Sequence, residues 1–218
     1  IMKCEGKIAL VTGCTSGIGK ATMYKLLEER ETLNGLSMLD PLTGLYNRRG
    51  LQHRLDTLLA LSNSRHFVLL LDIDHFKSYN DHYGHVQGDS AINEVADILR
   101  NSVRKNDTVI RYGGEEMVMF ISGIRPDAAL RTADEIQKKL SEKSIEHKYS
   151  DISDKLTVSM GIYNTEYAGQ DIYSLIDKAD IALYRAKEKG RNRFIIYNES
   201  KHGSLENNSR HIHKILDL

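Results

Sequence analysis

The chain alternates between short apolar runs and longer segments in which apolar residues recur every three or four positions. The short runs predict the strands of a buried sheet, at 67–74, 108–112, 117–121, 156–162 and 193–197. The longer segments predict amphipathic helices, at 48–61, 90–103, 128–140 and 175–186, with a polar helix or turn at 75–81. The order strand, helix, two strands, helix, strand, preceded by a helix, predicts a ferredoxin-like α/β (α+β) sandwich, with an antiparallel-rich central sheet flanked by helices.

The first 35 residues have a separate pattern. Residues 7–12 predict a strand, residues 13–19 form a glycine-rich turn, and residues 20–33 predict a helix that Asn34 and Gly35 would cap. We therefore expect three parts: a short N-terminal strand-loop-helix extension (1–35), one domain (36–200) and a polar tail with little structure (201–218).

Charge and composition narrow the classes of function. Thirty basic side chains balance thirty acidic ones, and a net charge of zero argues against nucleic acid or an anionic membrane as a partner held by bulk charge. The apolar runs are far shorter than the ~20 residues of a membrane span, so we expect no membrane segment. With only two cysteines, Cys4 and Cys14, a disulfide framework is excluded and a cytoplasmic location is favoured.

Two acidic clusters carry the candidate chemistry. Asp72 and Asp74 end an apolar run, and residues two apart in a strand point to the same face. Two buried carboxylates need a positive partner, and a divalent cation such as Mg²⁺ suits oxygen ligands. Glu115 and Glu116 follow two glycines at a predicted hairpin tip, which could bring them beside Asp72. The alternatives are a strand end that becomes polar and a solvated turn.

Several segments together resemble the successive motifs of GGDEF-domain diguanylate cyclases. They are Asp40–Arg49, Asp72–Lys77 with Asn80 and Asp81, Gly84–Asp89, Arg111–Met117, Thr157–Gly161 and Ala179–Asn192. The resemblance covers roughly residues 36–198. It implies a fold like the palm of nucleotide polymerases. It also implies that a homodimer of GTP-loaded domains condenses two GTP into cyclic di-GMP and releases pyrophosphate. A catalytically weak module that binds GTP or cyclic di-GMP is the alternative.

The resemblance also implies a role for each matching residue. Mg²⁺ (or Mn²⁺) would be held by Asp72, the carbonyl of Ile73, Glu115 and Glu116. Glu115 would act as general base, and Lys77 would neutralise charge on the triphosphate. Asn80 and Asp89 would read guanine, because a carboxylate accepts from two guanine donors that adenine lacks. The remaining substrate-side positions are His85, Gly113, Gly114, Lys187 and Arg191. Lys187 and Arg191 are four apart, which predicts one helical face directed at phosphates.

Arg104 and Asp107 resemble the Arg-x-x-Asp site at which cyclic di-GMP inhibits members of the family. The planar donors of an arginine suit a guanine edge and a phosphate. An ordinary ion pair at a helix end is the alternative.

The chain departs from the family at Met117, where phenylalanine is usual. We expect this side chain to pack behind the acids, where a flexible methionine fills the space of an aromatic ring imperfectly.

Thr12–Gly19 resembles a different family, because it matches the opening of short-chain dehydrogenases. In those enzymes a glycine-rich loop presents amide groups to a cofactor phosphate. A dinucleotide site needs several further βα units, and the cyclase-like domain begins where they would be. A nicotinamide-dependent oxidoreductase is therefore the least favoured of the three functions.

Overall fold

The computed structural model describes residues 38–51, 54, 66–122, 126–165 and 172–199. The predictions for the N-terminal extension, for most of the helix at 48–61 and for the polar tail lie outside these residues. A helical segment begins at Arg48, as predicted, and is described as far as Leu51 and again at Arg54.

Five strands form one sheet in the spatial order β2-β3-β1-β4-β5. Their bounds are β1 His66–Ile73, β2 Thr108–Gly113, β3 Glu116–Ser122, β4 Val158–Thr165 and β5 Phe194–Ile196. β1 lies in the centre and pairs antiparallel with both β3 and β4, and β2 pairs antiparallel with β3. The first four strands and their helices thus confirm the ferredoxin-like sandwich. β5 instead pairs parallel with β4, because helix α6 lies between them in the chain and returns it to the same end of the sheet.

Four helices connect these strands: α3 Phe76–Tyr83, α4 His85–Arg100, α5 Pro126–Lys143 and α6 Ile172–Glu188. The polar segment after β1 is therefore a helix. α4 begins five residues before the predicted start at 90, because Gly84 (φ 82°) separates it from α3 and its first turn is too polar to show an apolar stripe. In the part of the chain that the structure describes, no helix is both long and apolar enough to cross a membrane.

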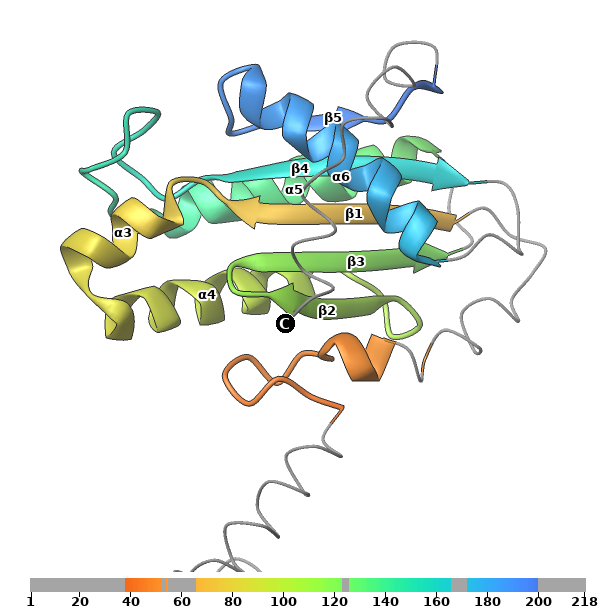
Figure 1. The fold of residues 1–218 in the computed structure, drawn as a ribbon, viewed down its shortest axis with the longest axis horizontal. Helices are drawn as coiled ribbons and strands as arrows, with labels where there is room; N and C mark the ends of the chain where they lie inside the picture. Colours follow the sequence, from red (N-terminus) through yellow and green to blue (C-terminus); the bar gives the residue numbers. More distant parts are fainter. Residues whose placement is uncertain (1–37, 52–53, 55–65, 123–125, 166–171, 200–218) are drawn as a thin grey trace, which may run out of the picture. The chain divides into compact units, whose positions relative to one another are not determined.

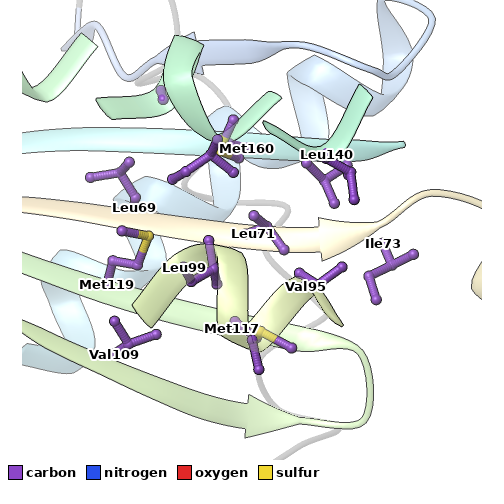
Figure 2. Packing of buried hydrophobic residues seen from close by; sticks show 14 of the residues in the cluster. Leu69, Leu71, Ile73, Val95, Leu99, Val109, Met117, Met119, Leu140 and Met160 are labelled. Carbon is purple, nitrogen blue, oxygen red and sulfur yellow. The ribbon is translucent and has the colours of Figure 1, made fainter. Parts of the chain in front are cut away.

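The sheet is covered on both faces. Successive side chains of β1 alternate, so that Leu69 and Leu71 face α4 and α5 while Val68 and Leu70 face α6. In Figure 1, α6 crosses in front of the sheet and α5 lies behind it. Figure 2 shows the larger cluster, in which α4 supplies Val95 and Leu99 and Leu140 is among the residues packed against the strands. Each such buried side chain contributes about 1.5–3 kcal/mol to folding.

Gly161 in β4 determines how closely α6 approaches the sheet. A Cβ atom at this position would lie 1.9 Å from the carbonyl oxygen of Ala179 and 2.3 Å from the amide nitrogen of Leu183. Both atoms belong to the backbone of α6, which could not yield without moving the helix. The missing side chain therefore allows α6 to lie directly on the sheet, and the end of α6 to reach the end of β1.

The segment that precedes the sheet lies along the outer edge of β2 (Figure 1). The amide of Arg111 donates to the carbonyl of Tyr46 at 2.8 Å. The Asp40 carboxylate accepts from the guanidinium of Arg111 at 3.0 and 3.1 Å and from the hydroxyl of Thr43 at 2.7 Å. These bonds tie the Asp40 turn to the strand that leads into the acidic hairpin.

Candidate active site

The C-terminal end of β1 and the β2–β3 turn lie at the same end of the sheet (Figure 1). Asp72 of β1 is the register partner of Glu116 of β3, which confirms that the two acidic clusters are neighbours. On the α6 side of the sheet, the ammonium group of Lys187, at the end of α6, lies 2.9 Å from the Asp72 carboxylate. Three groups far apart in the sequence thus meet on the α6 side of the sheet.

Burial is the largest influence on the pKa values of Asp72 and Glu116. It raises the pKa of Asp72 to about 6, although the charge of Lys187 acts in the opposite direction. The pKa of Glu116 is raised to about 7, chiefly by burial and also by the nearby charges of Asp72 and Asp180, while the charge of Lys187 acts in the opposite direction. More negative charge is gathered here than one lysine neutralises. The site therefore suits an additional cation.

Glu115 lies at the turn between β2 and β3, half-buried, and its charge acts on Asp72. Gly114 has a φ of 33°, and the β2–β3 pairing shifts in register between Arg111 and Gly113. The Nε atom of Arg111 donates to the carbonyl of Gly114 at 2.9 Å. The same guanidinium binds Asp40, so one arginine holds the acidic turn to the segment before the sheet. The motifs in the sequence do not indicate this role for Arg111.

Asp74 lies on the same side of the sheet as Asp72, as predicted, and its charge raises the pKa of Asp72. β1 ends at Ile73, and Asp74 lies in the following turn with only 1% of its surface exposed. Its carboxylate accepts from the hydroxyls of Thr157 and Ser159 at 2.8 and 2.7 Å. Ser159 is the β4 register partner of Asp72, so the Ser159 bond places Asp74 on the face that Asp72 shares, while both of its carboxylate oxygens are occupied by hydroxyl donors.

The candidate guanine site lies where α3 and α4 meet. Asn80 of α3 packs over Gly88 of α4 so closely that a Cβ atom at Gly88 would lie 1.9 Å from Asn80 Oδ1. That oxygen is buried and has no hydrogen-bond partner among the described residues. Asp89 follows Gly88, and His85 lies one turn before it, both exposed. Asn80 thus packs against the turn of α4 that carries His85 and Asp89.

Lys77 lies within a helix, whereas Arg191 lies beyond the end of one. Lys77 is exposed on α3, three residues before Asn80. The prediction that Arg191 shares a helical face with Lys187 is wrong, because α6 ends at Glu188. Gly190 (φ 100°) stops the helix, and the amide of Arg191 turns back to the carbonyl of Ala186 at 3.0 Å. Arg191 therefore lies in a left-handed turn just beyond α6.

Arg104 and Asp107 form a closed turn between α4 and β2. The carboxylate of Asp107 accepts from the backbone amide of Arg104 at 2.9 Å and from its Nε at 3.3 Å. The side chain of Arg104 is 58% exposed and that of Asp107 only 3%.

Met117 is fully buried, and it faces α4 and α5, on the side of the sheet opposite the acids. It packs behind the acids, as expected.

Asp180 is a member of the acidic site that the sequence analysis missed. Its charge raises the pKa of Glu116. It precedes Lys187 by seven residues, or two helical turns, so both belong to the same face of α6. That spacing was a usable signal, although only the packing of α6 on the sheet shows which strand the face meets.

The fold and the acidic strand ends define a palm-like α/β domain with a candidate site for a metal ion and phosphate groups. Within that class, the chain belongs to the GGDEF domain family ("Diguanylate cyclase, GGDEF domain"), which it matches over residues 37–193.

Two curated relatives carry the name diguanylate cyclase. Diguanylate cyclase A of Treponema denticola is 40% identical over 126 residues, covering 58% of this chain and 33% of the relative. Diguanylate cyclase VdcA of Vibrio cholerae is 35% identical over 170 residues, covering 78% and 50%. The chain thus spans a third to a half of the length of these relatives.

A solved structure shows the same fold. The coiled coil and GGDEF domain of DgcB from Caulobacter crescentus, in complex with c-di-GMP, superposes with a TM-score of 0.67 at 30% identity. The match covers 81% of this chain and 94% of that chain.

Proposed function

We propose that this domain is a diguanylate cyclase, which condenses two GTP into cyclic di-GMP and releases two pyrophosphates. The observation that carries the proposal is the meeting of Asp72, Glu115 and Glu116 at adjacent strand ends, with Lys187 above them. The family and the names of the relatives support the reaction. We also propose that the boundaries of this domain lie near residues 35 and 200 and that the protein has a cytoplasmic location.

The donors at the strand ends fit a Mg²⁺ ion. Asp72, the carbonyl of Ile73 and Glu115 would hold it, with Glu116 close by. Among the described residues no group of three or more histidine, cysteine or acidic side chains is gathered for a closed metal cage. A site of two carboxylates and one carbonyl leaves positions for phosphate oxygens, as Mg²⁺ prefers. The ion would polarise the α-phosphate and stabilise the leaving pyrophosphate.

The chain's own groups would then bind and orient GTP. Glu115 takes the proton of the attacking 3′-hydroxyl, and the backbone at Gly113 and Gly114 allows the triphosphate to approach. The cationic side chains neutralise the triphosphate: Lys77, Lys187 and Arg191. Asn80 and Asp89 bind the guanine edge, beside His85.

A homodimer follows from the chemistry of the reaction. Cyclic di-GMP contains two 3′-to-5′ phosphodiester bonds, and each forms when the 3′-hydroxyl of one GTP attacks the α-phosphate of the other. One domain offers a single set of these groups. Two GTP-loaded copies must therefore face each other, and the symmetric arrangement supplies each half-site once.

The direct experiment is incubation with GTP and Mg²⁺, followed by chromatography of the nucleotides and an assay of pyrophosphate. Cyclic di-GMP and pyrophosphate should appear in a ratio of one to two. Chelation of the metal should stop the reaction. Binding of GTP or cyclic di-GMP without any product would instead favour the regulatory module.

Replacing Arg104 by alanine is expected to abolish inhibition by cyclic di-GMP while leaving the initial rate nearly unchanged. Arg104 lies between α4 and β2, with an exposed guanidinium. Loss of charge-assisted bonds of ~1.5–3 kcal/mol each weakens product binding tenfold or more. Isothermal titration of wild type and variant with cyclic di-GMP measures this, and equal affinities would remove the regulatory site. An ion pair with no other role would change stability slightly and leave inhibition intact.

Replacing Glu116 by glutamine is expected to stabilise the metal-free domain above pH 7 and to have little effect on stability near pH 4.5. The pKa of Glu116 is about 7 when folded, above the 4.5 of a free glutamate. Between those values the folded state keeps a proton that the unfolded chain has lost, so wild-type stability falls as pH rises. The gain is at most about 3 kcal/mol.

Thermal unfolding in the presence of a chelator, at pH 5 and pH 8, measures the effect. Glu142→Gln is the control, because Glu142 is an exposed glutamate on α5. Its melting temperature should differ from wild type by the same small amount at both pH values. A Glu116→Gln variant that is no more stable than wild type at pH 8 contradicts the electrostatic account of this site.

A further inference from the structure

Asp74 is a buried carboxylate to which the proposed reaction gives no role. It is 1% exposed, and each of its oxygens accepts hydrogen bonds from neutral donors. Oδ1 accepts from Ser159 at 2.7 Å, and Oδ2 accepts from the hydroxyl of Thr157 at 2.8 Å and from the backbone amide of Asn192 at 3.0 Å. A buried carboxylate is tolerated only when it is hydrogen-bonded in this way. Both oxygens are thus turned toward β4 and the turn after α6.

The turn that Asp74 binds is conformationally unusual. Gly190, Arg191 and Asn192 have consecutive φ values of 100°, 56° and 47°. Residues other than glycine rarely adopt the left-handed region, and they remain there only when their surroundings hold them. On one side the turn is bonded to the end of α6, through Arg191 and Ala186. On its other side the amide of Asn192 is bonded to Asp74.

Asp74 also lies directly beyond the end of β1 at which the metal ion is proposed to bind. Asp74 follows Ile73 directly, and its own amide donates to the carbonyl of Thr157 at 2.9 Å. One residue therefore ties the exit of β1 to the turn that carries Arg191, although Asp74 and Arg191 are 117 positions apart in the chain.

We propose that Asp74 is a positioning residue, which holds the turn at residues 190–192 so that Arg191 is directed at the triphosphate beside Lys187 and the end of β1. Asp74 itself touches no substrate and acts through Arg191. The inference rests on the proposed function, because it needs a phosphate group for Arg191 to bind.

A double-mutant cycle between Asp74 and Arg191 tests the inference. The measurement is the affinity for 3′-deoxy-GTP with Mg²⁺, by isothermal titration, because this probe lacks the attacking hydroxyl and is not consumed. Asp74→Asn has the same shape but is a weaker acceptor, and it should reduce affinity by about fivefold. Asp74→Ala leaves three donors unpaired and should reduce affinity by about twentyfold or more. In an Arg191→Ala background either change should have less than about a twofold effect.

Ser159→Ala is the matched control. It removes the donor to Oδ1 and leaves the bonds to Oδ2 intact, so it should lower the melting temperature with less than about a twofold change in affinity. If Asp74→Ala does not fold, Asp74→Asn completes the cycle. Equal effects of the Asp74 change in both backgrounds would show a general structural role and overturn the inference. So would an Arg191→Ala variant that binds the probe as wild type does.

Failure of the inference is distinguishable from failure of the proposed function. If wild type forms cyclic di-GMP while the cycle shows no coupling, only the positioning role is wrong. If wild type neither binds 3′-deoxy-GTP nor forms product, the proposed function is wrong and the inference falls with it.

Discussion

Replacing Glu115 by glutamine is expected to reduce cyclic di-GMP formation by about a thousandfold or more and to leave the domain folded. General-base catalysis contributes about 10²–10⁴-fold to a rate, and the same change removes one charge from a metal site. The domain should still fold because Glu115 is half-buried at a turn and is not part of the hydrophobic core. Initial rates at saturating Mg²⁺ and GTP measure the effect, with circular dichroism to confirm folding.

Glu94→Gln is the matched control for that change. Glu94 lies on α4, where its carboxylate pairs with Lys143 of α5 at 2.7 Å. This variant should keep nearly the wild-type rate, since it alters one exposed ion pair far from the acidic turn in the chain. Near-normal turnover of Glu115→Gln at saturating Mg²⁺ would contradict both roles given to Glu115.

Selectivity for GTP over ATP should be at least about a hundredfold in wild type and should fall to a few-fold in Asp89→Ser. A carboxylate placed at the guanine edge accepts from two donors, and the matching adenine edge leaves it unpaired. Serine is too short to make both bonds. The neighbouring Asn80 Oδ1 is buried and has no hydrogen-bond partner among the described residues.

The measurement is the affinity for 3′-deoxy-GTP and 3′-deoxy-ATP in the presence of Mg²⁺. Asp97→Ser is the control, because Asp97 is an exposed aspartate on the same helix, paired with Arg100. It should keep the wild-type selectivity. A wild-type domain that binds the two nucleotides equally would show that Asp89 does not read guanine.

Much of the candidate site was predictable because its signals are local. Asp72 ends an apolar run, and the acids follow two glycines between two short strands. Strand pairing then places Asp72 opposite Glu116. The fold class needed only the alternation of strands and helices, since a strand-helix-strand-strand-helix-strand chain has few ways to bury both faces of a sheet.

Local periodicity failed where a helix ends. Arg191 lies three residues beyond Glu188, the last residue of α6. The four-residue spacing that placed Arg191 beside Lys187 stops at Glu188. Periodicity relates two side chains only while the backbone angles remain regular.

By itself, the sequence determined the strands and helices, the fold class, the family and the presence of acids at one end of the sheet. Only the tertiary structure decided which groups neutralise or hold those acids: Lys187 on Asp72, Asp180 beside Glu116, and Arg111 between Asp40 and Gly114. The physical reason is that these partners lie on different elements. Their meeting depends on strand register and on the close approach of α6 that Gly161 permits. Neither can be predicted from the local pattern of apolar and polar residues.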